Sequence, residues 1–327
     1  MNRLSIRLKP DTTGVRKVDT GVRASVWWSL SPLLFLPLWC PALAGLTADQ
    51  AVFRARTDLV GISASVKRDN APVANLAAAD FRVTDNGVAQ AIEAVTIEAV
   101  PLDVTLFMDT SGSTAGALDR MKKNVVSIAG MLRPDDQFRL LTIGLSVETP
   151  VPWQRAGSRM TLDMKAVPGI SLIYDALFVA LTHTPAAGRR HLIVAMTDGE
   201  DCGSLLDGAR VLDASARSEA VMHWIYVSSG GDFDPNSVSA WCTPSDAREV
   251  DFVGHSAART GGDSHRSRFG DPAVRTFAQI LDEFRQSYVL RYTPQGVPAS
   301  GWHAVSVTIP AQPALTIKAR SGYFGAR

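Results

Sequence analysis

The stretch VTLFMDTSGS, residues 104–113, joins a continuous apolar run to an acidic residue and a series of hydroxyls. An apolar run of this kind is typical of a strand buried on both faces of a parallel sheet. Asp109, Ser111 and Ser113 follow it directly. Because aspartate and serine are also favoured where a strand turns into a helix, the stretch alone leaves a reaction centre, a metal site and a helix cap open.

Apolar strands and amphipathic helices alternate after this stretch. Apolar residues at steps of three and four predict a helix at 118–132, which ends before Pro134. Further strands are predicted at 138–145, 191–198 and 221–229, and further helices at 172–181, 205–218, before 261, and at 272–287. This alternation predicts an α/β fold with a doubly wound, mostly parallel sheet and helices on both faces.

Short alternating runs flank the α/β pattern on both sides. Residues 59–100 alternate with period two between Asn-Gly and Asn-Ala-Pro turns, which predicts a small antiparallel unit of at most five strands, of immunoglobulin-like or similar type. Three strand-like runs end the chain, and we expect them to complete the sheet that the first runs begin. The predicted divisions are residues 1–44, 45–100, 101–287 and 288–327, where 288–327 packs with the first β element.

The N-terminus has the pattern of an export signal. Six basic residues precede the apolar stretch VWWSLSPLLFLPLW, and small residues follow at Ala42 and Ala44. We expect a signal peptide over 1–44 with cleavage after Ala44 and no stable membrane span afterwards. An uncleaved membrane anchor is the alternative. Cleavage removes six basic and two acidic residues and changes the formal charge from +1 to −3, which gives no basic field for nucleic acid.

Two cysteines, Cys202 and Cys242, remain after residue 44. In an oxidising compartment an even pair indicates a disulfide, and two separate buried thiols are the equal alternative. Cys242 lies in an irregular stretch at 230–250. A bridge would tether the loop after Asp198 to that stretch.

Oxygen-bearing side chains follow three predicted strands or loops of the α/β part. Asp109 and Asp198 each come directly after a strand, Ser111 and Ser113 follow in the first loop, and Ser171 precedes a helix. Since the carboxyl ends of parallel strands meet at one edge of the sheet, we expect all five to face one crevice. Mg²⁺ prefers oxygen ligands with one or two carboxylates, and Mn²⁺ and Ca²⁺ accept the same set. The pattern predicts a divalent metal site.

The residues DTSGS at 109–113 resemble the DxSxS motif of von Willebrand factor type A (VWA) domains, which forms their metal-ion-dependent adhesion site (MIDAS). Ser171 and Asp198 hold the places of the hydroxyl and the aspartate that complete the site from two further loops. The family usually has threonine where Ser171 stands. The resemblance implies that Ser111, Ser113 and Ser171 bind the ion directly and that the aspartates act largely through water.

The order of a β-rich head, this domain, and the closing ARSGYF resembles a bacterial exported group called VWFA-related domain proteins, over residues 55–325. The resemblance implies an exported, non-enzymatic adhesion protein that binds a protein ligand through an acidic side chain on the metal. An envelope assembly subunit is the alternative function, and a metal-assisted hydrolase is the third.

Other chemistries fit the sequence less well. A haloacid-dehalogenase-type phosphatase needs a second acid where Ser111 stands. An aspartic protease needs two DTG or DSG motifs, and a serine hydrolase needs a GxSxG elbow. The six histidines show no metal spacing and are predicted to be surface or core residues. Asp175 either assists the metal loop or begins a helix, and Glu200 and Asp201 either form a solvated turn or tune the field at the ion.

Overall fold

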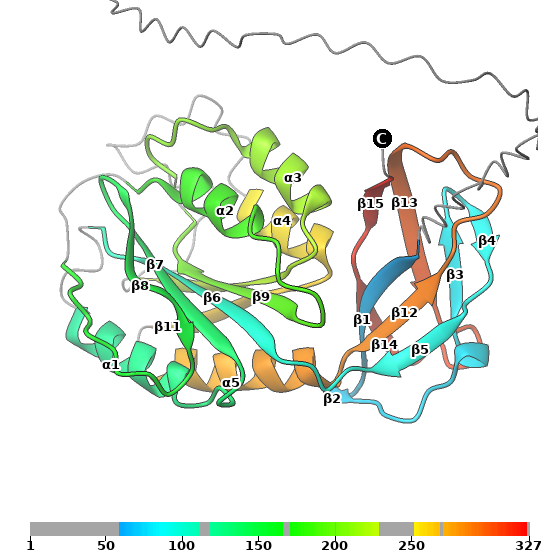
Figure 1. Cartoon of the computed structure of the whole chain (residues 1–327), viewed down its shortest axis with the longest axis horizontal. Helices are drawn as coiled ribbons and strands as arrows, with labels where there is room; N and C mark the ends of the chain where they lie inside the picture. The colour runs from blue at the N-terminus through cyan, green and yellow to red at the C-terminus, as the bar shows by residue number, and fades with distance from the viewer. Residues whose placement is uncertain are drawn as a thin grey trace, which may run out of the picture. The chain divides into compact units, whose positions relative to one another are not determined.

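The computed structural model describes residues 59–111, 118–165, 171–199, 201–228, 252–268 and 271–325. The predicted signal peptide and its cleavage site lie outside these residues. Within the described part of the chain, no helix is both long and apolar enough to cross a membrane. The described residues from 59 onward belong to one compact unit, in which an α/β sheet with its helices is joined to a β-sandwich (Figure 1).

The α/β part is built on a six-stranded sheet with the order β11-β10-β9-β6-β7-β8. Its strands are parallel except for β8, which is antiparallel to β7. The strands are β6 (Leu102–Asp109), β7 (Gln137–Ile143), β8 (Val147–Arg155), β9 (Arg190–Thr197), β10 (Val221–Ser228) and β11 (Ser264–Arg268). This sheet confirms the predicted doubly wound, mostly parallel α/β fold.

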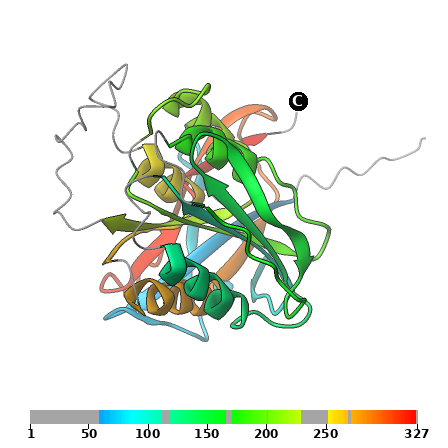
Figure 2. The same cartoon turned by 90° about the vertical axis from the view of Figure 1, so that its left-hand side faces the viewer.

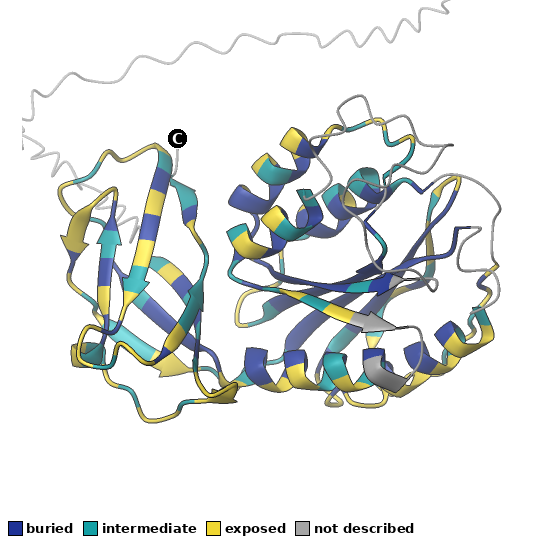
Figure 3. Ribbon diagram, turned by 180° about the vertical axis from the view of Figure 1, so that it is seen from behind, coloured by how far each residue is buried: buried dark blue, intermediate teal, exposed yellow. Residues whose placement is uncertain are grey.

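Helices cover both faces of the sheet, as Figures 1 and 2 show. One face carries α1 (Leu118–Ala129) and α5 (Asp271–Gln286), and the other carries α2 (Ile173–Leu181), α3 (Gly208–Arg217) and α4 (Phe252–Thr260). Every residue of β6 is buried, as the burial colours show (Figure 3). Its side chains alternate between the two cores. Val104, Leu106 and Met108 pack toward α1 and α5, while Phe107 packs toward α2.

The two strands at the ends of this sheet are not predicted from the sequence. β8 contains Pro150 and Pro152, which cannot donate hydrogen bonds to a ladder and therefore argue against a strand. The structure accommodates both because β8 has a partner, β7, on one side only. β11 has the polar sequence SHRSR and lacks the apolar pattern of a buried strand. Edge position explains both strands, since an edge strand needs neither full burial nor a complete ladder.

The β-sandwich combines strands from both ends of the described chain. Residues 60–97 contribute β1 (Val60–Arg68), β2 (Ala71–Pro72), β3 (Arg82–Asp85), β4 (Val88–Gln90) and β5 (Ala94–Ile97), with the 3-10 turn Ala78–Asp80. Residues 288–325 contribute β12 (Tyr288–Tyr292), β13 (Gly301–Thr308), β14 (Thr316–Ala319) and β15 (Gly322–Gly325).

The two sheets of the sandwich have the orders β14-β1-β12-β5, with β2 beside β1, and β15-β13-β3-β4. Each sheet mixes early and late strands: β1 pairs with β12 from Val60↔Tyr292 to Ala64↔Tyr288. Ile62, Val83 and Leu290 form part of the shared core. The α/β part is therefore inserted in sequence between the two halves of the sandwich.

A histidine pair, of which His223 is buried and His265 half-buried, lies between β10 and β11. His223 Nδ1 lies 3.1 Å from His265 Nε2. Burial lowers the pKa of His223 well below its usual value, and His265, Lys318 and Lys67 lower it further. Burial also lowers the pKa of His265, which Glu283 partly opposes and Lys67 reinforces. Both rings are therefore neutral at neutral pH.

Acidification is expected to weaken the fold through this pair. A histidine whose pKa is lowered by folding contributes stability above its unfolded pKa of about 6.5, and that stability is lost as the pH falls below it. The free energy of unfolding should therefore fall between pH 7 and pH 5, and His223→Gln should reduce this fall by on the order of 1 kcal/mol. Urea titrations at both pH values measure the difference. His255→Gln, at an exposed histidine, is the control, and an equal pH dependence in all three proteins would contradict the assignment.

Candidate metal centre

The candidate centre lies where β6, β7 and β9 end at the same edge of the sheet. In the parallel ladders, Asp109 pairs with Ile143 of β7 and Met108 pairs with Met196 of β9. The first loop is fixed to β7 because Thr110 donates two hydrogen bonds to the Ile143 carbonyl, from its backbone N–H at 2.9 Å and its hydroxyl at 2.8 Å. The ladder and these two hydrogen bonds thus set the direction in which the chain continues after Asp109, the last residue of β6.

Asp109 is only 2% exposed and accepts hydrogen bonds from three segments. The Ser111 N–H donates to Oδ1 at 2.8 Å. The Ser171 hydroxyl lies 3.4 Å from Oδ1 and 3.3 Å from Oδ2, and the Thr197 hydroxyl donates to Oδ2 at 3.2 Å. The first loop, the residue before α2 and the end of β9 therefore converge on one carboxylate.

The structure brings three of the five predicted site residues together: Asp109, Ser111 and Ser171. The two serines are 4% and 5% exposed, so both are enclosed beside the carboxylate. Asp198 follows Thr197 at the same edge and is half-buried. Ser113 lies outside the described residues. The metal-binding role of all five stays a prediction.

Thr197 is a member of this cluster that the sequence does not reveal. Seven consecutive residues of β9 are buried, so no alternation shows which face Thr197 occupies. Trp224 fixes the end of the strand through its Nε1–H, which donates to the Thr197 carbonyl at 3.0 Å. Gly199 follows with a φ of +83°, and a Cβ there would lie 2.7 Å from the Trp224 ring. The Gly199 N–H donates to the Thr197 hydroxyl at 3.1 Å, which orients that hydroxyl.

Two aspartates, Asp175 and Asp201, join the third loop to the start of α2. Asp201 Oδ1 accepts the Tyr174 N–H at 3.0 Å, which satisfies a free donor of the first helical turn. In return, Asp175 accepts the N–H groups of Leu205 at 3.0 Å and Leu206 at 2.9 Å. The hydrogen bonds of these two aspartates therefore fix the third loop to the start of α2. Burial raises the pKa of Asp201, and hydrogen bonds led by the Ser204 hydroxyl oppose that shift. Glu200 lies outside the described residues.

Cys202 adds a further link beside the second loop. Its N–H donates to the Ser171 carbonyl at 2.9 Å, directly next to the candidate centre. Cys202 is disulfide-bonded. The other two cysteines of the sequence, Cys40 and Cys242, both lie outside the described residues, so the pairing with Cys242 stays a prediction.

The charge on Asp109 is poorly compensated by the residues around it. Burial raises its pKa, and the hydrogen bonds from Ser111, Thr197 and Ser171 oppose that shift only in part. None of the ion pairs among the described residues involves Asp109. A buried carboxylate without a cationic partner is costly, and enclosed hydroxyl oxygens beside it are suitable ligands for a hard divalent ion. The donor set therefore fits the predicted metal.

A metal site made only of His, Cys, Asp and Glu side chains would be of a different kind from this centre. Within the described ranges, no group of three or more His, Cys, Asp or Glu side chains is placed to hold a metal. The candidate centre combines carboxylates with hydroxyls, so it is not a group of that kind. His191, His223 and His303 are buried and contact Thr105, His265 and Asp85 respectively.

No family model and no curated protein matches the sequence. Solved structures do match. An aerotolerance-related membrane protein from Bacteroides fragilis is 16% identical with a TM-score of 0.40, over 57% of this chain and 99% of that chain. A von Willebrand factor type A structure from Catenulispora acidiphila is 13% identical with a TM-score of 0.43, over 84% of this chain and 65% of that one. Proximal thread matrix protein 1 from the mussel byssus, with a zinc-occupied MIDAS motif, is 15% identical with a TM-score of 0.43, over 61% of this chain and 49% of that protein.

These TM-scores and identities are low, so the matches carry no argument about function. The strand order β11-β10-β9-β6-β7-β8 defines a doubly wound α/β domain, and the oxygen-bearing residues lie at the end of its fully buried strand β6. The chain is an α/β protein whose central domain is similar to von Willebrand factor type A domains.

Proposed function

We propose that the chain is an exported, non-enzymatic binding protein that holds one divalent cation at the ends of β6 and β9. Asp109, Ser111, Ser113, Ser171 and Asp198 hold the ion, which is Mg²⁺, or Mn²⁺ or Ca²⁺ in its place. The observation that carries the proposal is the Asp109 carboxylate, which is buried, surrounded by hydroxyls and outside every ion pair of the described residues.

The hydrogen bonds give each residue a task. Because Ser171 directs its proton toward Asp109, its lone pairs stay available to a cation. The Thr197 hydroxyl and the Ser111 N–H hold the carboxylate in one orientation. The bound ion would accept one further oxygen ligand from outside the chain. The binding partner is a protein that offers an acidic side chain to the ion.

Two exposed leucines support a protein ligand. Leu205, in the loop that Asp175 fixes, is 95% exposed, and Leu145, two residues after β7, is 59% exposed. Leu145 follows β7 at the edge of the sheet where Asp109 lies, and Leu205 lies in the loop that is bonded to Asp175 of α2. Apolar contacts beside an ion-bound carboxylate would select among partners, because the ion itself recognises only the acid.

A binding role is favoured over catalysis by the residue two positions after Asp109. A haloacid-dehalogenase-type phosphatase needs a second acid there, and the chain has Ser111, whose N–H is already bonded to Asp109. Export is supported by the basic and apolar pattern of residues 1–44.

Capture of a partner from a cell-envelope extract tests the proposal. The wild-type chain is expected to retain a partner protein in Mg²⁺, to release it in EDTA, and to rebind it when Mg²⁺ is restored. Asp109→Asn should retain none of it, whereas Asp119→Asn, at an exposed position of α1, should behave as the wild type. Equal capture in EDTA and in Mg²⁺ would instead indicate metal-independent assembly.

A further inference from the structure

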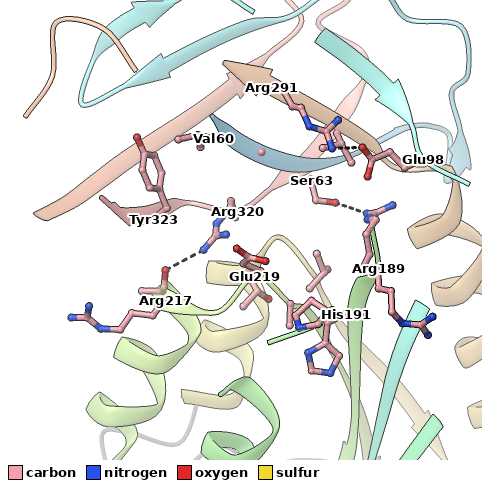
Figure 4. A pocket seen from close by; sticks show the side chains of 18 of the residues that line it. Val60, Ser63, Glu98, Arg189, His191, Arg217, Glu219, Arg291, Arg320 and Tyr323 are labelled. Carbon is pink, nitrogen blue, oxygen red and sulfur yellow. Dashed lines mark hydrogen bonds and ion pairs between the residues drawn. The ribbon is translucent and has the colours of Figure 1, made fainter. Parts of the chain in front are cut away.

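A cavity of about 700 Å³ lies where the amino end of β9 faces the sandwich (Figure 4). Its wall includes Arg190 at the start of β9, Ser63 of β1 and Arg320 between β14 and β15. The candidate metal centre lies at the other end of β9, which spans eight residues and hence about 25 Å. The cavity is therefore separate from that centre and does not depend on the proposed function.

Arg190 is held at this cavity by uncharged groups. Its Nη1 donates to the Phe284 carbonyl at 3.2 Å, and its Nη2 donates to the hydroxyls of Ser63 at 2.8 Å and Ser287 at 2.7 Å. Its guanidinium also lies 4.1 Å from the centre of the Phe284 ring. None of the ion pairs among the described residues involves Arg190, so its charge is fixed in place but not neutralised.

Arg320 is held in the same manner from the other side. Its Nε donates to the Gly322 carbonyl at 2.8 Å, and its Nη2 donates to the carbonyls of Ala216 at 3.1 Å and Ser218 at 3.0 Å. No ion pair of the described chain contains Arg320. Carbonyl groups orient a guanidinium without cancelling its charge.

The remaining arginines of the wall differ from these two. Each is paired with a carboxylate: Arg189 with Asp103, Arg291 with Glu98, and Arg217 with Asp213. The exposed Glu219 is the carboxylate of the wall that makes no ion pair within the described residues, and Figure 4 shows it beside Arg320. Two unpaired cations against one exposed acid leave the cavity with an excess of positive charge.

Burial is the main cause of the lowered pKa values of Arg190 and Arg320. Burial lowers the pKa of Arg190 to about 10, which Glu98 opposes and the like charge of Arg291 reinforces. Burial also lowers the pKa of Arg320, and Glu219 opposes that shift. Both arginines remain charged at neutral pH, but in surroundings that disfavour the charge. A bound anion would remove that disadvantage.

We propose that this cavity binds a small anion that carries carboxylate or phosphate groups, through the guanidinium groups of Arg190 and Arg320. Its volume suits a small organic molecule. The apolar wall formed by Phe284, Val289 and Phe324 accommodates the uncharged part of such a molecule. The planar guanidinium groups match both kinds of anion, so the two are distinguished by experiment.

Isothermal titration of citrate and of pyrophosphate into the full chain at low ionic strength tests the site. We expect saturable binding of at least one probe, and the stronger of the two identifies a carboxylate or a phosphate ligand. Arg320→Gln should weaken that binding about tenfold. Glu219→Gln should tighten it about threefold, because it removes the unpaired carboxylate beside Arg320.

Two matched variants of α1 control for a change in net charge: Arg120→Gln and Asp119→Asn, both at exposed positions. Each should leave the affinity unchanged. Glu219→Gln decides the result if Arg320→Gln fails to fold, since Glu219 is exposed and makes no ion pair within the described residues. Absence of binding by both probes, or binding that Glu219→Gln does not strengthen, would overturn the proposal.

Discussion

Replacing Asp109 with asparagine is expected to abolish the rise in Tm that Mg²⁺ gives the wild-type protein. An ion that binds only the folded state at 100 times its Kd adds about 2.7 kcal/mol to the free energy of unfolding. For a chain of this size that corresponds to a rise of about 4 to 5 °C. The rise depends on Asp109 because its charge is buried and has only hydrogen-bond donors around it. Thermal melts with MgCl₂ or with EDTA measure the effect.

The matched control for this change is Asp119→Asn, which removes one exposed carboxylate from α1. It should keep the full response to Mg²⁺, because only Asp109 lies among the hydroxyls of Ser171 and Thr197. If Asp109→Asn gained as much stability from Mg²⁺ as the wild type does, the ion would be bound elsewhere on the chain.

Asp85→Ala is expected to destabilise the sandwich by about 3 to 5 kcal/mol, because it leaves buried side-chain donors without their acceptor at about 1 to 3 kcal/mol each. Asp85 is fully buried and accepts hydrogen bonds from three side chains. The Tyr292 hydroxyl lies at 3.0 Å, the Tyr323 hydroxyl at 2.7 Å and His303 Nδ1 at 2.8 Å. Since Asp85 belongs to β3 and its partners to β12, β13 and β15, the substitution breaks a link between the two halves of the sandwich. Equilibrium denaturation in urea measures the loss.

Asp213→Ala is the control for that measurement. Asp213 forms a surface ion pair with Arg217, four residues later on α3, and both side chains are about half exposed. Solvent screens such exposed pairs, so this variant should be close to the wild type. A loss for Asp85→Ala no larger than that for Asp213→Ala would mean that the Asp85 cluster does not hold the sandwich together.

The fold could be predicted from the sequence where burial leaves a pattern. β6 is a continuous apolar run because helices cover both of its faces, and the helices show spacings of three and four. β8 and β11 could not be predicted, because strands at the edge of a sheet tolerate Pro150, Pro152 and a polar sequence. The pattern thus marks the centre of this sheet better than its edges.

The candidate site could be predicted in part, because residues that follow neighbouring parallel strands lie close together at one edge of the sheet. Asp109, Ser111 and Ser171 are brought together as the order of strands and loops indicates. Thr197 was not predictable, because a hydroxyl within a fully buried strand gives no sign of the face it occupies. The cavity could not be predicted either. Arg190 and Arg320 lie far apart in the sequence, and they line one cavity only because the sandwich packs on the α/β part.

The central claim is that the ends of β6 and β9 hold a divalent cation. Isothermal titration of MgCl₂ and of MnCl₂ into the wild-type chain and into Asp109→Ala tests it most directly. The account predicts saturable heats with one ion per chain for the wild type and none for the variant. Equal heats for the two proteins would contradict it.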